Sequence, residues 1–266
     1  MVFVLILLLI IKICSMKIAL CLHGQPRNYE AGFQYINNHI IKKYDTDVFI
    51  HTWWDDSLIG QNYNVNKQTV GNTYKIEENL NQKLTSLYNP KEIILETPIV
   101  FKPSKIYPVS DPNHHDSIYD ALLSRSYSMY KSVNLRNKYL DLYDFTIIVR
   151  FDLRINQFPN LHNLQKDNIY VSDGHPGRPY IFYDFVFITG NHYKYIGDMY
   201  NHVLETFERQ QTLTEENKRE LHYEPEMINS AWKGFDFHHI LAYYLLFGGL
   251  INKTHKLNDL NTFFIR

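Results

Sequence analysis

Three short apolar runs, each followed at once by polar residues, constrain the fold of this chain more than any other feature. They are "KIALCL" from Lys17, "DVFI" from Asp47 and "TIIV" from Thr146. Continuous runs rich in Val, Ile and Leu, rather than alternating ones, are typical of strands buried on both faces in a parallel sheet. We expect strands at Lys17–Leu22, Asp47–His51, Glu92–Leu95, Thr146–Val149, Ile169–Val171 and Phe185–Thr189.

The segments between these strands have the apolar spacing of helices. "YEAGFQYINNHIIKKY", "SRSYSMYKSVNLRNKYLDLY", "NHYKYIGDMYNHVLETF" and "FDFHHILAYYLLF" repeat apolar residues near helical spacing. An order of strand, helix, strand predicts an α/β fold with a mainly parallel central sheet and flanking helices.

Composition limits the classes of protein to consider. The chain has 266 residues, 45% of them hydrophobic, so a sizeable core is expected, and we predict one domain over residues 16–266. A net charge of −1 argues against non-specific nucleic-acid binding, and we expect no nucleic-acid partner. Two cysteines without zinc spacing exclude a domain built on disulfides.

Residues 1–15 form a hydrophobic N-terminal segment. The apolar run ends at Lys12, short of the roughly 20 residues that a membrane span needs. It also lacks the basic start and small-residue cleavage site of a signal peptide. We expect a membrane anchor or an extension ahead of a start at Met16, and therefore a cytoplasmic or membrane-associated protein.

The first polar stretch, "HGQPRN", contains Gly24, Gln25 and Arg27. In α/β folds, a glycine turn between a strand and a helix can bind phosphate through backbone N–H groups and a nearby arginine. The stretch matches neither a GxGxxG fingerprint nor a Walker loop. A plain turn with a solvated Arg27 is the alternative.

The second stretch, "HTWWDD", begins at His51. A tryptophan here, Trp53 or Trp54, could stack on a base or a sugar face, and Asp55 or Asp56 could bind hydroxyl groups. In the alternative interpretation the tryptophans fill the core and the aspartates cap the next helix. Adjacent residues face opposite ways, so at least one tryptophan should be structural.

The third stretch, "RFDLRI", gives the sharpest signal. Arg150 and Asp152 share one face of the chain because Phe151 between them points the other way. Asp152 could ligate a divalent cation that holds a diphosphate, and Arg150 could bind the same phosphate with two hydrogen bonds. A local ion pair is the alternative.

Three carboxylates are candidates for a catalytic base. Asp184 precedes an apolar strand, Glu226 precedes a candidate helix and Asp236 stands at the start of the next. A buried carboxylate with a raised pKa could accept the proton of a hydroxyl group. For Asp184 a hairpin connection is the alternative, and for Asp236 a helix cap.

Four stretches in this order, "LCLHGQPRNYE", "DVFIHTWWDD", "SRSYSMYKSVNL" and "YDFTIIVRFDL", resemble a glycosyltransferase family found in bacterial polysaccharide loci and large DNA viruses. Its pattern combines G-Q-x-R, a strand ending in F-x-H-x-W and a strand ending in R-x-D-L. The resemblance covers about residues 17–250.

The resemblance implies a GT-A-like fold, an α/β sandwich that binds a nucleotide sugar. It implies that Gly24, Gln25 and Arg27 border the nucleotide. It places Arg150 and Asp152 where GT-A enzymes carry a D-x-D metal motif. The first Asp of that motif is replaced by Arg150, so Mn²⁺ or Mg²⁺ at Asp152 and direct neutralisation of the diphosphate by Arg150 both stay open.

We therefore expect a glycosyltransferase that moves a sugar from a nucleotide-diphosphate sugar to a glycan or another hydroxyl acceptor. His51 and Trp53 join the nucleotide-binding set, and Asp184, Glu226 and Asp236 the catalytic one. The alternative is a non-catalytic nucleotide- or carbohydrate-binding protein on the same fold. A nucleotidyltransferase or phosphatase would need several acidic ligands converging on a metal.

Overall fold

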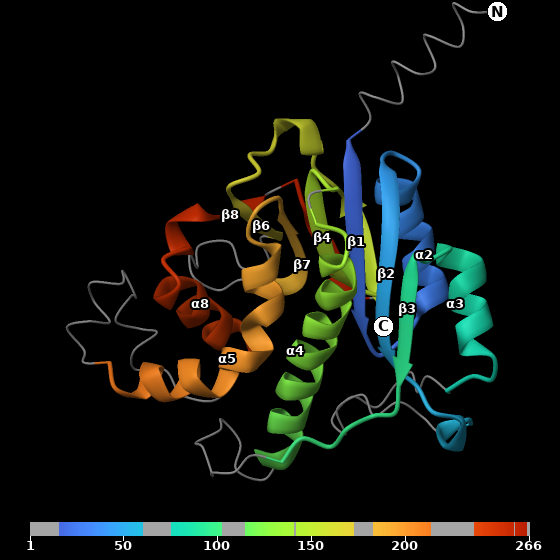
Figure 1. Ribbon diagram of the computed structural model, residues 1–266, viewed down its shortest axis with the longest axis horizontal. Helices are drawn as coiled ribbons and strands as arrows, with labels where there is room; N and C mark the ends of the chain where they lie inside the picture. Colours follow the sequence, from blue (N-terminus) through green and yellow to red (C-terminus); the bar gives the residue numbers. More distant parts are fainter. Residues whose placement is uncertain are drawn as a thin grey trace, which may run out of the picture.

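A seven-stranded sheet with the strand order β3-β2-β1-β4-β7-β6-β8 forms the centre of the protein (Figure 1). The computed structural model describes residues 16–60, 76–102, 115–140, 142–172, 183–213, 237–257 and 259–264. The strands of this sheet are β1 (Lys17–Gly24), β2 (Asp45–Trp53), β3 (Glu92–Glu96), β4 (Phe145–Arg150), β6 (Ile169–Ser172), β7 (Tyr183–Thr189) and β8 (Thr254–Leu257).

The sheet is mainly parallel, as predicted. β1 pairs in parallel with β2 and β4, and β2 pairs in parallel with β3. β7 alone runs the other way, because it is antiparallel to both of its neighbours, β4 and β6. All six predicted strands are confirmed, whereas β8 and the small antiparallel pair of β5 (Leu153–Gln157) and β9 (Asn261–Phe264) were not predicted.

Helices cover both faces of the sheet (Figure 1). On one face lie α4 (His115–Asn137), α5 (Tyr193–Gln211) and α8 (Phe237–Phe247). On the other lie α2 (Tyr29–Ile36), its π-helical continuation Asn37–Ile41, and α3 (Leu80–Tyr88). This double cover explains the continuous apolar runs. In β1, for example, Ala19 and Cys21 face α4 while Leu20 and Leu22 face the α2 side.

The order of the strands creates a switch point between β1 and β4. The chain passes from β1 to β2 and then β3 on one side, and α4 carries it back to β4 on the other side of β1. Ligands of open α/β sheets bind outside the carboxyl ends of the strands at such a point. Both "HGQPRN" and "RFDLRI" begin in the last residues of the two strands that meet there.

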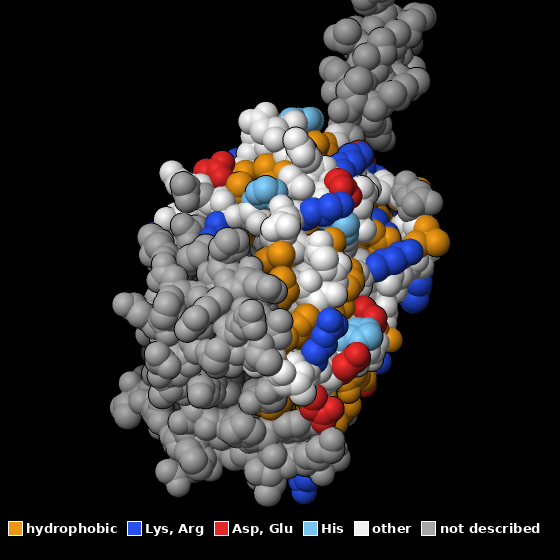
Figure 2. All heavy atoms as spheres, turned by 90° about the vertical axis from the view of Figure 1, so that its left-hand side faces the viewer, with side chains coloured by type: hydrophobic (Ala, Val, Ile, Leu, Met, Phe, Trp, Pro, Cys, Tyr) orange, Lys and Arg blue, Asp and Glu red, His pale blue; other side chains and the backbone are white. Residues whose placement is uncertain are grey.

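The surface carries charges of both signs. On the side shown in Figure 2, basic and acidic side chains are interspersed over the described residues. Exposed pairs such as Lys166 with Asp144 and Lys253 with Asp167 contribute to this mixture, which agrees with the net charge of −1. Among the residues that the structure describes, no helix is long and apolar enough to cross a membrane.

Gly32 in α2 allows the helix to lie directly against the turn between β4 and β5. A Cβ atom at Gly32 would overlap the backbone carbonyl oxygen of Phe151, the residue between Arg150 and Asp152. A backbone atom cannot move aside as a flexible side chain can, so helix and turn would have to separate.

We therefore predict that Gly32→Ala lowers the free energy of unfolding by about 3 kcal/mol, at the upper end of the usual overpacking cost. Denaturant unfolding checks this, with Gln34→Ala as the control because Gln34 is exposed on the same helix. Equal stability of the two variants would contradict the close packing of α2 on this turn.

Candidate functional site

The turn after β1 is tight, and Gly24 at its start is held by two neighbouring elements. Gly24 has φ of +95°, a backbone conformation that favours glycine, and the N–H of Arg27 donates to the carbonyl of Gln25 at 2.8 Å. The N–H of Gly24 donates to Ser128 Oγ at 2.7 Å, and its carbonyl accepts from Thr52 Oγ1 at 2.8 Å. The turn is therefore fixed to both α4 and β2.

Asp152 contacts two arginines at the switch point. Arg150 donates to both of its carboxylate oxygens, from Nε at 3.0 Å and from Nη2 at 2.8 Å. Nη2 of Arg27 lies 3.6 Å from Oδ2 of Asp152, the oxygen that Nη2 of Arg150 also contacts. Arg150 is 8% exposed and Asp152 5%. The structure thus brings together three predicted site residues, in the ion pair that the alternative interpretation described.

His23 and His51 lie in one row across the sheet with Arg150. In the parallel register, His23 of β1 lies beside His51 of β2 and beside Arg150 of β4. His23 is fully buried, and neither ring nitrogen has a hydrogen-bond partner among the described residues. Burial, together with the charges of Arg150 and Arg125, lowers the pKa of His23 well below its usual value, so its ring is neutral near pH 7.

Sequence reasoning missed His23 and Arg125. Arg125 lies on α4 one turn before Ser128, the residue that binds Gly24, so both side chains leave the same side of the helix. Its charge contributes to lowering the pKa of His23. It is the register of the β1–β4 pair that puts His23 beside Arg150.

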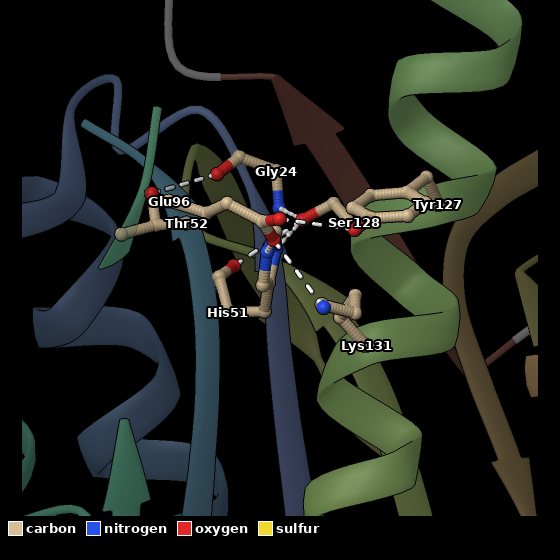
Figure 3. A network of polar contacts seen from close by, with 7 residues as sticks. All are labelled: Gly24, His51, Thr52, Glu96, Tyr127, Ser128 and Lys131. Atoms are coloured by element: carbon tan, nitrogen blue, oxygen red, sulfur yellow. Dashed lines mark hydrogen bonds and ion pairs between the residues drawn. The ribbon is translucent and has the colours of Figure 1, made fainter. Parts of the chain in front are cut away.

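His51 is the centre of a polar network that joins β1, β2, β3 and α4 (Figure 3). Its Nδ1 lies 2.7 Å from Ser128 Oγ, and its Nε2 lies 2.9 Å from Oε2 of Glu96. Tyr127 donates to the other oxygen of Glu96 at 3.0 Å, and Lys131 lies 3.6 Å from Oε2. Burial lowers the pKa of His51 to about 4, against the opposing effect of Glu96, so the contact with Glu96 is a hydrogen bond of a neutral ring.

The tryptophans divide between the two faces of the sheet. Trp53 is buried and stacks on Tyr127 of α4 with ring centroids 5.5 Å apart. Trp54 donates from Nε1 to the carbonyl of Glu77 at 3.1 Å, on the side of α2 and α3. The contacts described here for His51 and Trp53 are with protein groups, and their predicted part in nucleotide binding stays a prediction.

Asp55 behaves as a cap. Its carboxylate accepts from the N–H of Ser57 at 2.8 Å and from Thr97 Oγ1 at 2.8 Å, at the start of the short 3₁₀ helix Asp56–Leu58. This is the capping role that the alternative interpretation gave to the aspartate pair.

The side chains of the three candidate bases lie outside the residues that the structure describes. Asp184 lies in β7, but its side chain is outside the described residues. Glu226 and Asp236 also lie outside them. A catalytic role for these carboxylates stays a prediction.

A divalent cation does not fit Asp152 with the contacts described. Both carboxylate oxygens accept from Arg150, and Arg27 stands close to one of them. A cation bound there would displace one guanidinium and be repelled by both. Among the residues that the structure describes, no group of three or more His, Cys, Asp or Glu side chains is arranged to hold a metal ion.

Comparisons with known proteins find solved structures of low similarity to this chain. No protein-family model matches the sequence, and no curated protein matches it. The apo crystal structure of mouse xyloside xylosyltransferase 1 matches with 11% identity and a TM-score of 0.43, over 91% of this chain and 84% of that one. The glycosyltransferase GlyE of Streptococcus pneumoniae TIGR4 matches with 12% identity and a TM-score of 0.40, over 92% of this chain and 46% of GlyE. This chain thus spans less than half of GlyE, and similarities at this level do not assign an activity.

The neutral, buried state of His51 predicts a pH dependence of stability. Its pKa is about 6.5 in the unfolded chain and about 4 in the fold. Between these values the unfolded chain binds a proton that the folded chain does not bind, so the free energy of unfolding falls as the pH falls. The loss is up to about 3 kcal/mol by pH 4.

His51→Gln should reduce the slope of the free energy of unfolding against pH between pH 6.5 and pH 4. The buried His23 accounts for part of the slope that remains in this variant. Denaturant unfolding at several pH values measures this slope. His255→Gln is the control, because His255 is exposed on β8. An unchanged slope in His51→Gln would contradict a buried neutral ring.

Proposed function

We propose that this protein is a glycosyltransferase of GT-A-like fold that uses a nucleotide-diphosphate sugar as donor and a glycan or another hydroxyl compound as acceptor. The observation that carries the proposal is the group of Arg27, Arg150 and Asp152 at the carboxyl ends of β1 and β4. It stands at the switch point of the sheet, where ligands of α/β folds bind.

The chemistry of sugar transfer fits such a group. The bond between the anomeric carbon and the diphosphate oxygen breaks, and its electron pair stays on the diphosphate. Cationic groups held in advance of the reaction stabilise this leaving group, because they need no reorganisation as charge develops. Arg150, oriented by two hydrogen bonds to Asp152, meets that requirement.

Two further features support a diphosphate at this place. The glycine turn leads directly into α2, whose first residue is Tyr29, and the N-terminus of a helix favours an anion. The turn itself is anchored through both backbone groups of Gly24.

The acceptor oxygen forms the new bond to the anomeric carbon and loses its proton to a base. Asp184, Glu226 and Asp236 remain our candidates for that base. Membrane association through residues 1–15 also stays a prediction.

The test is turnover of a panel of UDP-, GDP-, CDP- and dTDP-sugars by the full chain, measured as release of the nucleoside diphosphate. We expect selective turnover with one nucleotide. Asp152→Asn should reduce that turnover by about a hundredfold or more, because Arg27 and Arg150 lose the charge that orients them.

Asp167→Asn is the matched control. Asp167 is an exposed aspartate that binds Lys253. It lies just before β6, at the amino ends of the parallel strands and away from the proposed site. Thermal unfolding of each variant reports whether the fold is intact. Binding of a nucleotide without turnover of any sugar would favour the non-catalytic nucleotide-binding protein instead.

A further inference from the structure

We propose that the groove between α4 and α5 binds a neutral sugar unit. The groove has a volume of about 310 Å³, which is near the lower end of the volumes usual for small-molecule sites. None of the residues that line it belongs to the proposed donor site, so the inference goes beyond the proposed function and does not rest on it.

The groove lies away from the proposed donor site. α4 and α5 lie side by side on one face of the sheet (Figure 1), and α4 runs from the carboxyl end of β3 back to the amino end of β4. Asn137 of the groove follows Ser128 by nine residues, roughly 13 Å along the helix axis. A sugar held here would therefore not occupy the place of the diphosphate.

The floor of the groove is a close contact between the two helices. Gly197 of α5 and Val133 of α4 both line it, and a Cβ atom at Gly197 would lie 2.6 Å from Cγ1 of Val133. Because Gly197 has no side chain, nothing from this position fills the space beside Val133. The longer side chains that line the groove, among them Tyr130 and Tyr195, form its walls.

Two tyrosine rings give the groove a rigid apolar surface. Tyr130 of α4 contacts Tyr200 of α5, with ring centroids 5.9 Å apart. Tyr195 stacks on Tyr244 of α8 with ring centroids 4.3 Å apart, and its hydroxyl donates to the carbonyl of Tyr244 at 2.6 Å. Both rings are thus held by neighbouring helices before a ligand arrives, which lowers the entropy lost on binding.

Two asparagines on one side of α4 supply hydrogen-bonding groups. Nδ2 of Asn137 donates to Oδ1 of Asn134 at 3.1 Å, whereas Oδ1 of Asn137 is buried and has no hydrogen-bond partner among the described residues. A buried acceptor without a donor is unfavourable. The terminal torsion of asparagine is broad, so a small rotation offers this oxygen to a hydroxyl donor in the groove.

The charged side chains that line the groove balance each other. Lys194 and Asp198, both on α5, contribute one positive and one negative charge. Asn201 donates to Oδ1 of Asp198 at 2.6 Å, and Nε2 of His202 lies 3.1 Å from its Oδ2, so this carboxylate is oriented by its own helix. A balanced pair of charges favours a neutral polar ligand over a phosphate or a strongly charged peptide.

A sugar matches this combination of surfaces. A pyranose ring has faces made of C–H groups and a rim of hydroxyl groups, each of which can donate and accept. The two tyrosine rings and Val133 suit the faces of the ring. The amides of Asn134 and Asn137, with the charged groups opposite them, suit the rim.

The test is saturation-transfer difference NMR of the full chain with four neutral trisaccharides, namely maltotriose, cellotriose, xylotriose and triacetylchitotriose. Titration of each sugar gives its Kd. We expect at least one of them to bind. Saturation should be strongest on the C–H protons of one face of a sugar ring, because that face lies against a tyrosine ring.

Variants locate the interaction. Asn137→Leu should raise the Kd of the bound sugar by about tenfold, the loss of a hydrogen bond to a buried group, and Tyr130→Leu should raise it by removing the ring. The free energy of unfolding of Asn137→Leu should not fall, because leucine has a similar size and leaves no buried acceptor unpaired. Asn81→Leu is the matched control, since Asn81 is exposed on α3 at the other face of the sheet.

Three results would overturn the sugar site in the groove. The first is that none of the four trisaccharides binds, and the second is binding that Asn137→Leu and Tyr130→Leu leave unchanged. The third is displacement of the sugar by UDP, GDP, CDP or dTDP. That displacement would place the sugar at the donor site, so it would support the proposed function while it overturned the groove.

Discussion

The buried pair of Asp152 and Arg150 is the interaction on which the site depends. Removing two opposite charges from water is costly. The attraction between the charges offsets this cost only when the hydrogen-bond geometry between the two groups is good. Here the guanidinium and the carboxylate meet through two parallel bonds, and a second arginine approaches the same oxygen. A hydrophobic pair of similar volume would serve stability equally well. Its position at the switch point therefore argues for a role in ligand binding rather than in folding.

The supports of this pair come from both faces of the sheet. On the α2 side, Gly32 lets the helix approach the carbonyl of Phe151, between the two charged residues. On the α4 side, Ser128 holds Gly24 while His51 connects that serine to Glu96. The neutral ring of His51 allows this buried network to exist without a charge at its centre. The loops that carry Arg27 and Asp152 are thus fixed at several points, as a preorganised site requires.

Much of this architecture could be predicted from the sequence because buried parallel strands leave a strong signal. The apolar runs of β1, β2 and β4 are long enough to be recognised, and the period of two placed Arg150 and Asp152 on one face. The strand β5, "LRINQ", was missed because only two of its residues are buried, at alternating positions, and β8, "THKL", was missed because it is short and polar at the edge of the sheet. His23 and Arg125 were missed for another reason. Their position depends on which strands are neighbours and on how α4 lies across them, and spacing within one segment does not contain that information.

The residue at position 150 decides what kind of site this edge of the sheet can be. In a D-x-D motif two carboxylates stand side by side, and their mutual repulsion is relieved by a cation that also holds the diphosphate. An arginine in the first position replaces a negative charge with a positive one, and the second carboxylate then binds that arginine instead. Both oxygens of this carboxylate are thereby engaged by the arginine at the end of β4. Arg27, from the turn after β1, lies 3.6 Å from the same carboxylate. In the glycosyltransferase that we propose, Arg150 supplies to the leaving group the positive charge that a metal supplies beside a D-x-D motif.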